Sequence, residues 1–194
     1  CNDKITAARA ALHPWEEPCI SGNRGSGTIF FSGCTLKCVF CQNYTLSHEN
    51  FGIEISAERL AEIFLELQEK GAHNISLVTA TQYLPSIRDA LNIVRPQLSI
   101  PVVYNSGGYE RIETLREYAD CIDIYLPDLK YYDSRLAKKY SAAENYFPTA
   151  SRAITEMIRL SGGLQWDEND PNILKKGVVI RHLVLPGAKE DSIA

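Results

Sequence analysis

Residues 28–44 read TIFFSGCTLKCVFCQNY, an apolar run followed directly by three cysteines. The run at residues 28–32 is rich in β-branched and aromatic side chains, which predicts a buried strand. Cys34, Cys38 and Cys41 follow it with C-x3-C-x2-C spacing. A loop this short can wrap three thiolates around one small object, so the stretch predicts a metal centre directly after a strand.

The number of cysteines in the loop narrows the kind of metal centre. A structural zinc site has four ligands, and a ferredoxin-type iron–sulfur cubane is also held by four cysteines. Three thiolates on a cubane leave one iron open to bind a substrate. Zinc with Cys19 as the fourth ligand would satisfy the same thiolates, and an auxiliary metal role for Cys1 and Cys19 stays open. Cys121 is expected to be a small buried hydrophobic residue.

Strands and helices alternate on the carboxyl side of this loop. Further strands are predicted at residues 75–79, 101–104, 121–126 and 178–185. Helices are predicted near residues 56–71, 87–96, 112–119, 133–143 and 148–160. This order implies an α/β fold with a parallel sheet and right-handed crossovers, either closed into a barrel or open.

Polar and glycine residues gather where the predicted strands end. They occupy residues 79–81, 105–108, 127–130 and 186–187, in addition to the cysteine loop. Ligands of parallel sheets and barrels bind at the carboxyl ends of the strands. The five strand ends are therefore expected to build one site.

The whole-chain composition limits the function further. The 194 residues carry a net charge of −4 and no basic stripe, which argues against a nucleic-acid partner. No apolar run approaches the roughly 20 residues that span a bilayer, so no membrane partner is expected. A tight cysteine cluster in an α/β chain of this size favours a metal site over disulfides, and with it a reducing, cytoplasmic setting.

Two regions are expected along the chain. Residues 1–27 show no regular spacing of apolar residues, and they are expected to form an ordered lead-in that ends in a glycine turn. Residues 28–194 are expected to form a partial barrel. Because a five-stranded parallel barrel would be unusual, we expect the natural protein to extend beyond both ends of this chain.

The cysteine motif resembles that of the radical SAM superfamily, with Phe40 as the aromatic residue of a C-x3-C-x-aromatic-C pattern. The resemblance implies a [4Fe–4S] cluster on Cys34, Cys38 and Cys41, whose open iron binds S-adenosylmethionine (SAM). Reductive cleavage of SAM in that family gives a 5′-deoxyadenosyl radical that abstracts a hydrogen atom. Phe40 would then lie near the SAM adenine.

Other stretches resemble one branch of the superfamily. Residues 105–109, 124–130 and 180–187 are similar to strand ends of pyruvate formate-lyase activating enzymes, and residues 13–22 to a group of activating-enzyme-like iron–sulfur proteins. This resemblance implies a partial (β/α)6-type radical SAM barrel with about five strands present. It also implies a glycyl radical enzyme as protein substrate and an electron donor such as flavodoxin or ferredoxin.

The same resemblance assigns the first strand-end residues to SAM. Thr79 and Thr81 lie where many relatives have a Gly-Gly-Glu segment that meets the SAM amino group. Because no acid is present at residues 79–81, threonine hydroxyls or backbone carbonyls are expected to accept those hydrogen bonds.

The next strand ends are assigned to the SAM carboxylate. Asn105, Ser106 and Asp128 fall where activating enzymes build a monovalent-cation site, although those relatives have an aspartate in place of Asn105. The loss of one charge puts a bound cation in question. Lys130 and Arg181 are expected to pair with the SAM carboxylate.

Two alternatives remain at this point. The first is a radical SAM enzyme whose radical acts on a small molecule or a peptide instead of a glycyl radical enzyme. A hypothesis of another class is a non-catalytic zinc or iron–sulfur binding module.

Overall fold

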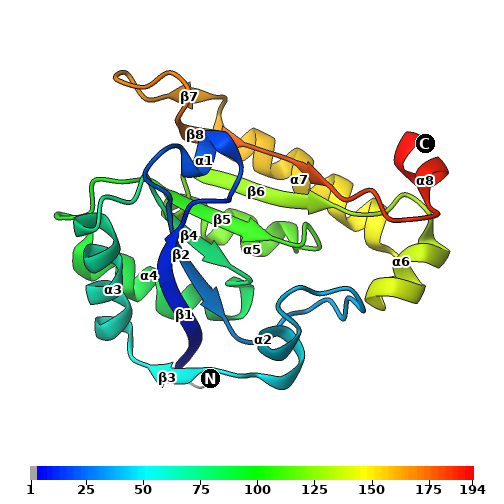
Figure 1. Cartoon of the computed structure of the whole chain (residues 1–194), viewed down its shortest axis with the longest axis horizontal. Helices are drawn as coiled ribbons and strands as arrows, with labels where there is room; N and C mark the ends of the chain where they lie inside the picture. The colour runs from blue at the N-terminus through cyan, green and yellow to red at the C-terminus, as the bar shows by residue number, and fades with distance from the viewer. Residues whose placement is uncertain (1–3) are drawn as a thin grey trace.

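The computed structural model describes residues 4–194, as a curved sheet with helices packed against it (Figure 1). The strands are β1 (Ile5–His13), β2 (Ser26–Phe31), β3 (Ile53–Ile55), β4 (Ile75–Val78), β5 (Val102–Ser106), β6 (Ile124–Leu129), β7 (Gln165–Trp166), β8 (Leu174–Val178) and β9 (Arg181–His182). The helices are α1 (Pro18–Ser21), α2 (Tyr44–Glu49), α3 (Ala57–Glu69), α4 (Leu84–Val94), α5 (Ile112–Glu117), α6 (Ser134–Ser141), α7 (Tyr146–Ser161) and α8 (Lys189–Ile193). Single 3-10 turns are η1 (Thr81–Tyr83) and η2 (Ala119–Cys121).

The sheet is mostly parallel, as the alternation of strands and helices predicts. Its order is β3-β1-β2-β4-β5-β6-β8-β7, with β9 beside β6. Neighbours from β2 to β8 run parallel, with Ile29 opposite Leu77, Leu77 opposite Tyr104 and Tyr104 opposite Tyr125. The carboxyl ends of these strands therefore meet at one edge, and the predicted α/β class with a partial parallel barrel is confirmed.

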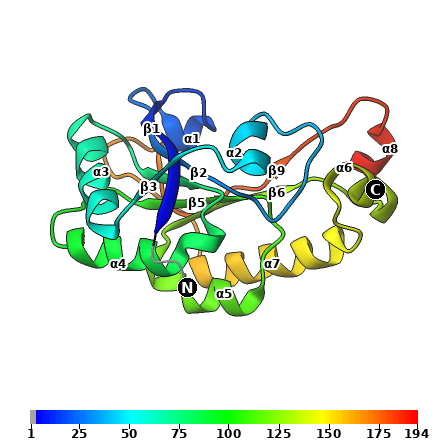
Figure 2. The same ribbon diagram turned by 90° about the horizontal axis from the view of Figure 1, so that it is seen from below.

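Helices α3, α4, α5 and α7 cover one face of the sheet, and α1 and α2 lie on the other (Figure 2). The covered face holds the main core, in which Phe64 of α3 and Ile87 of α4 pack with Leu77, Tyr104 and Tyr125. The apolar side chains of these helices recur at i, i+3 and i+4, which places them on one buried stripe. Within residues 4–194 no helix is long and apolar enough to cross a membrane.

The lead-in contains more regular structure than its sequence predicts. Strand β1 pairs antiparallel with β2 and with β3, and Ala10 lies opposite Ile29. Its sequence, ITAARAALH, has four alanines among nine residues, and small side chains weaken the alternation by which a strand is recognised. Cys1 lies outside the described residues.

The fifth predicted strand, at residues 178–185, is wrong in its bounds. Strand β8 begins at Leu174 and ends at Val178, and the two residues of β9 pair separately with β6. Lys175 and Lys176 give β8 a polar sequence that is untypical of a buried strand. Strand β8 pairs with β6 on its inner side and with the two-residue β7 on its outer side, where charged side chains reach solvent.

Candidate active site

The cysteine loop, defined here as residues 32–43, joins β2 to α2 at the carboxyl edge of the sheet. Its first turn is fixed by the Gly33 N–H, which donates to the Leu46 carbonyl at 2.8 Å. The Gln82 amide donates to the carbonyls of Ser32 and Gly33 at 2.9 and 3.1 Å. Gly33 has a φ of +85°, a conformation that favours glycine. The loop thus leaves the strand in a direction set by its neighbours.

The far side of the cysteine loop rests on the carboxyl end of α6. The Val39 N–H donates to the Tyr140 carbonyl at 2.9 Å, and the Lys37 N–H donates to the Ser141 carbonyl at 3.2 Å. These carbonyls belong to the last turn of a helix, where they have no partner within the helix. The loop and α6 therefore satisfy each other's backbone groups.

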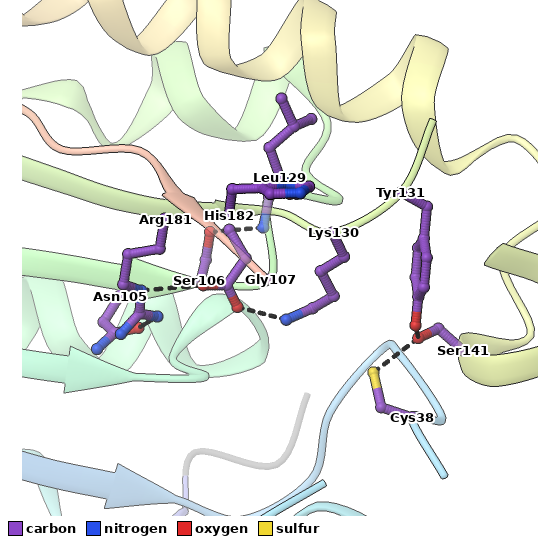
Figure 3. Close-up of polar contacts among 12 residues, drawn as sticks. Cys38, Asn105, Ser106, Gly107, Leu129, Lys130, Tyr131, Ser141, Arg181 and His182 are labelled. Atoms are coloured by element: carbon purple, nitrogen blue, oxygen red, sulfur yellow. Dashed lines mark hydrogen bonds and ion pairs between the residues drawn. The ribbon is translucent and has the colours of Figure 1, made fainter. Parts of the chain in front are cut away.

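Two of the three sulfur atoms have a hydroxyl neighbour. Cys38 Sγ lies 2.9 Å from Ser141 Oγ, which lies 2.7 Å from the Tyr131 hydroxyl (Figure 3). The Ser47 hydroxyl donates to Cys41 Sγ at 3.2 Å. Hydroxyl donors stabilise a negatively charged sulfur, so these contacts suit thiolates as well as thiols.

Burial raises the pKa of the Cys34 and Cys38 thiols. The three thiols lie close enough for Cys41 to raise the pKa of both others, and the Lys130 ammonium lowers it. A metal centre would replace the protons and remove this mutual repulsion. The donor set of three thiols on one loop, with hydroxyl donors and one nearby cation, fits a thiolate-bound cluster.

The same geometry bears on the zinc alternative. Within residues 4–194 no three His, Cys, Asp or Glu side chains converge closely enough to hold a single metal ion. Cys19 packs against a separate apolar cluster that includes Val103 and Leu126. It is therefore not placed as a fourth ligand to the cysteine loop.

A narrow cleft separates the cysteine loop from the carboxyl ends of β4 and β5. It brings together one predicted cluster ligand, Cys34, and three residues predicted to contact SAM or a cation beside it, Thr79, Thr81 and Ser106. Its lining consists of Cys34, Thr35, Leu36, Thr79, Thr81, Gln82, Ser106, Gly107, Tyr109 and Glu110. Gly107 is required here, because a Cβ at this position would lie 2.6 Å from the Leu36 side chain of the cysteine loop.

The two threonine hydroxyls of this cleft are already engaged. Thr79 donates to the Val78 carbonyl at 2.7 Å and has a φ of +55°, which is strained for a β-branched residue. Thr81 Oγ1 lies 2.7 Å from the Tyr104 hydroxyl and 3.2 Å from both carboxylate oxygens of Glu110. An acid that comes from a different strand end, Glu110, thus lies beside Thr81.

Four other predicted residues meet on the concave face of the sheet, around a residue that the sequence did not assign. Arg181 donates from Nε to Asp128 Oδ1 at 2.9 Å, from Nη2 to Asn105 Oδ1 at 2.7 Å and from Nη1 to Glu16 Oε1 at 3.0 Å. Asn105 Nδ2 donates to Glu16 Oε2 at 2.9 Å. Lys130 donates to the second oxygen of Asp128. Figure 3 shows Arg181 beside Asn105, with Lys130 on the side of Cys38.

The ion network consists of Glu16, Asn105, Asp128, Lys130 and Arg181. It offers no free carboxylate oxygen of Asp128 to the monovalent cation whose binding the sequence put in question. Both carboxylate oxygens of Asp128 already bind a cationic side chain. Asn105 contributes no charge, so two acids and two bases balance one another. Ser106 lies apart, where its hydroxyl accepts the Gly108 N–H at 3.2 Å and lines the cleft.

Sequence reasoning missed Glu16, Gln82 and Glu110. Glu16 lies 165 residues before Arg181, and only its place in the family-like stretch 13–22 marked it. Glu110 follows the Gly-Gly turn after β5. A search that extended a few residues further past each strand end would have included it among the candidate site residues. Phe40 is half-buried, with its ring centre 6.5 Å from that of Tyr131, and its role beside adenine stays a prediction.

Comparisons with known proteins agree with this geometry. Residues 28–193 match the model of the Radical SAM superfamily. Uncharacterized protein MJ0674 of Methanocaldococcus jannaschii is 32% identical over 170 residues, which cover 83% of this chain and 45% of that protein. The chain therefore spans less than half the length of this relative.

Two solved structures share the fold. The crystal structure of methylornithine synthase (PylB) has a TM-score of 0.55 and 17% identity, over 83% of this chain and 45% of that chain. Streptococcus suis SuiB has a TM-score of 0.54 and 17% identity, over 87% of this chain and 34% of that chain. At this identity the likeness concerns the fold alone. The family model matches most of this chain, and the three cysteines lie at the carboxyl edge of a partial barrel. The chain therefore belongs to the Radical SAM superfamily.

Proposed function

We propose that Cys34, Cys38 and Cys41 hold a [4Fe–4S] cluster and that SAM binds at the carboxyl edge of the sheet beside Cys34, where the residues of the narrow cleft form one wall of its site. The observation that carries this proposal is the cysteine loop itself, at the carboxyl end of β2 and directly against the cleft. Once reduced by an electron donor, a cluster held by these three cysteines would supply the single electron that cleaves the S–C5′ bond of SAM, and the resulting adenosyl radical would abstract a hydrogen atom from the substrate.

The residues of this chain would hold the reactants and exclude water. Ser141 and Ser47 stabilise charge on two of the sulfurs, and the Lys130 ammonium lies near Cys34 and Cys38. Leu36 of the cysteine loop packs with Tyr131 and Tyr146 in an apolar cluster beside the cysteines. Such an apolar cluster lowers the local dielectric and keeps a reactive radical away from solvent.

We propose a glycine of a partner enzyme as the target of the radical. The support is the similarity of residues 105–109 and 124–130 to the strand ends of activating enzymes. A small polar molecule is the second candidate, and the ion network favours it, because a concave face rich in paired charges can bind charged or zwitterionic groups.

The full-length protein should be reconstituted anaerobically with iron and sulfide, reduced, and mixed with SAM. The expected product is 5′-deoxyadenosine, measured by liquid chromatography with mass detection. Absence of this product from a protein with a full cluster would overturn the proposal of SAM cleavage. Adding a candidate glycyl radical enzyme should then give a protein radical visible by electron paramagnetic resonance. SAM cleavage that gives no such radical, but transfers hydrogen from a small molecule, would favour the second candidate.

A further inference from the structure

Glu110 is a buried acid to which no cationic side chain within residues 4–194 is paired. Only 5% of its surface is exposed. The other acids with little exposure, such as Glu16, Asp128 and Glu156, each bind at least one arginine or lysine. Burying a carboxylate without a positive partner is costly, so the position of Glu110 calls for an explanation.

The neighbours of Glu110 are hydroxyl groups. Thr81 Oγ1 lies 3.2 Å from each carboxylate oxygen, and the Tyr104 hydroxyl lies 2.7 Å from Thr81 Oγ1. Burial raises the pKa of Glu110, while hydrogen bonds from Tyr104, Thr81 and Ser106 lower it. These donors orient a carboxylate, but they bring no positive charge to balance it.

The location of Glu110 indicates what would balance it. Among the cleft-lining residues that the structure describes, Glu110 is the one acid, and it shares the cleft with Cys34. The strand-end cations Lys130 and Arg181 are paired with the carboxylates of the ion network. Within residues 4–194 no side chain supplies a cation for Glu110, so a positively charged group of the ligand would be its partner.

We propose that Glu110 accepts the amino group of SAM, in place of the acid that residues 79–81 lack. This inference rests on the proposed function, because it takes SAM as the ligand of the cleft. Glu110 reaches the cleft from the turn after β5, and Thr81, on the turn after β4, holds its carboxylate. A different strand end thus supplies the same chemistry, with Thr81 and Tyr104 as positioning residues.

The test measures binding to the reconstituted protein by anaerobic calorimetry, with three ligands. SAM has an amino group and a sulfonium, S-adenosylhomocysteine keeps only the amino group, and 5′-methylthioadenosine has neither. Glu110→Gln keeps the shape of the side chain and removes its charge. SAM and S-adenosylhomocysteine should bind about tenfold more weakly or worse, and 5′-methylthioadenosine should be unaffected. Glu113→Gln, an exposed acid on α5, is the matched control and should bind all three like the wild type.

A stability measurement separates a binding role from a structural one. Because Glu110→Gln removes an unbalanced buried charge, its thermal midpoint without ligand should equal or exceed that of the wild type. An unchanged SAM affinity, or equal weakening of all three ligands, would overturn the inference. If the wild-type protein with its cluster bound none of the SAM-type ligands, the proposed function itself would fail. That outcome is distinct from a failure of Glu110 alone.

Discussion

The cysteine loop and the ion network are neighbouring parts of one site, but they are assembled differently. The three thiols lie within eight residues, and backbone hydrogen bonds to α2 and α6 shape the loop that carries them. The ion network joins Glu16 to Asn105, Asp128 and Arg181, across up to 165 residues, through side chains alone. The first is a local chelate and the second depends on the whole sheet.

Lys130 connects these two regions. Its ammonium donates to Asp128 in the ion network, and its charge lowers the pKa of Cys34 and Cys38 in the cysteine loop. A change in one region can therefore reach the other through this one side chain. The predictions below test how independent the two regions are.

The largest effect is expected from removing a thiol. Replacing Cys34, Cys38 or Cys41 singly by Ala should reduce the iron content after reconstitution and abolish 5′-deoxyadenosine formation, because two thiolates cannot hold the cluster. Cys121→Ala is the matched control, since Cys121 is buried under the helices, 5% exposed, and should retain both iron and activity. A Cys41→Ala protein with full iron content would show that the ligand set is wrong.

A smaller effect is expected from breaking the ion network. Arg181→Met leaves Lys130 as the one remaining cation for the carboxylates of Glu16 and Asp128 in this network. The free energy of unfolding should fall by about 2 kcal/mol, which lies between the costs of breaking a surface ion pair and a buried ion pair. Urea unfolding would measure this loss. The exposed Arg111, mutated to Met, should change the free energy of unfolding by less than about 0.5 kcal/mol.

The same Arg181 variant tests the independence of the two regions. Its iron content should equal that of the wild type, because the contacts of Arg181 are to Glu16, Asn105 and Asp128 and not to the cysteine loop. Adding Glu16→Gln should recover part of the lost stability, since the stranded charge is removed. Loss of iron in the single variant would instead show that the ion network also shapes the loop.

Lys130→Met should affect both the cysteine loop and the ion network, and its effect on the cysteine loop should be a moderate electrostatic one on the reduction potential of the cluster. Loss of a positive charge near the thiolates disfavours adding an electron, so the cluster potential should fall by on the order of 50 mV, equivalent to about 1 kcal/mol. Potentiometric titration followed by electron paramagnetic resonance measures the shift. Lys138→Met, an exposed lysine on α6, is the control, and an equal shift in both variants would contradict a local role for Lys130.

The contrast between the regions also explains what the sequence could predict. The ligand spacing, the parallel strands β2, β4, β5 and β6, and the shared strand-end edge follow from local patterns. Asp128 and Arg181 were expected near SAM, but their pairing with Glu16 was not, because no local pattern relates residues so far apart. Glu110 was not predicted as a site residue, because an acid is recognised as buried and without a counter-charge only once the structure is known.

The smallest predicted effect concerns backbone strain, compared at one residue in the cleft and one residue away from it. Thr79, in the cleft, and Ala142, at the end of α6, both have a φ of +55°. Ala142→Gly should stabilise the protein by about 0.5–1 kcal/mol, because glycine adopts this conformation without strain at a helix end. Thr79→Asn should stabilise it by about 0.5 kcal/mol, since asparagine tolerates the left-handed region better than a β-branched residue does.

SAM affinity distinguishes the two strained positions. Thr79 lines the cleft, and Ala142 is exposed on the far side of the cysteine loop from it. We therefore expect Ala142→Gly to bind SAM like the wild type and Thr79→Asn to bind it more weakly, because strain kept at a ligand site usually serves the ligand. A Thr79→Asn protein that is more stable and binds SAM unchanged would show that this strain belongs to the fold alone.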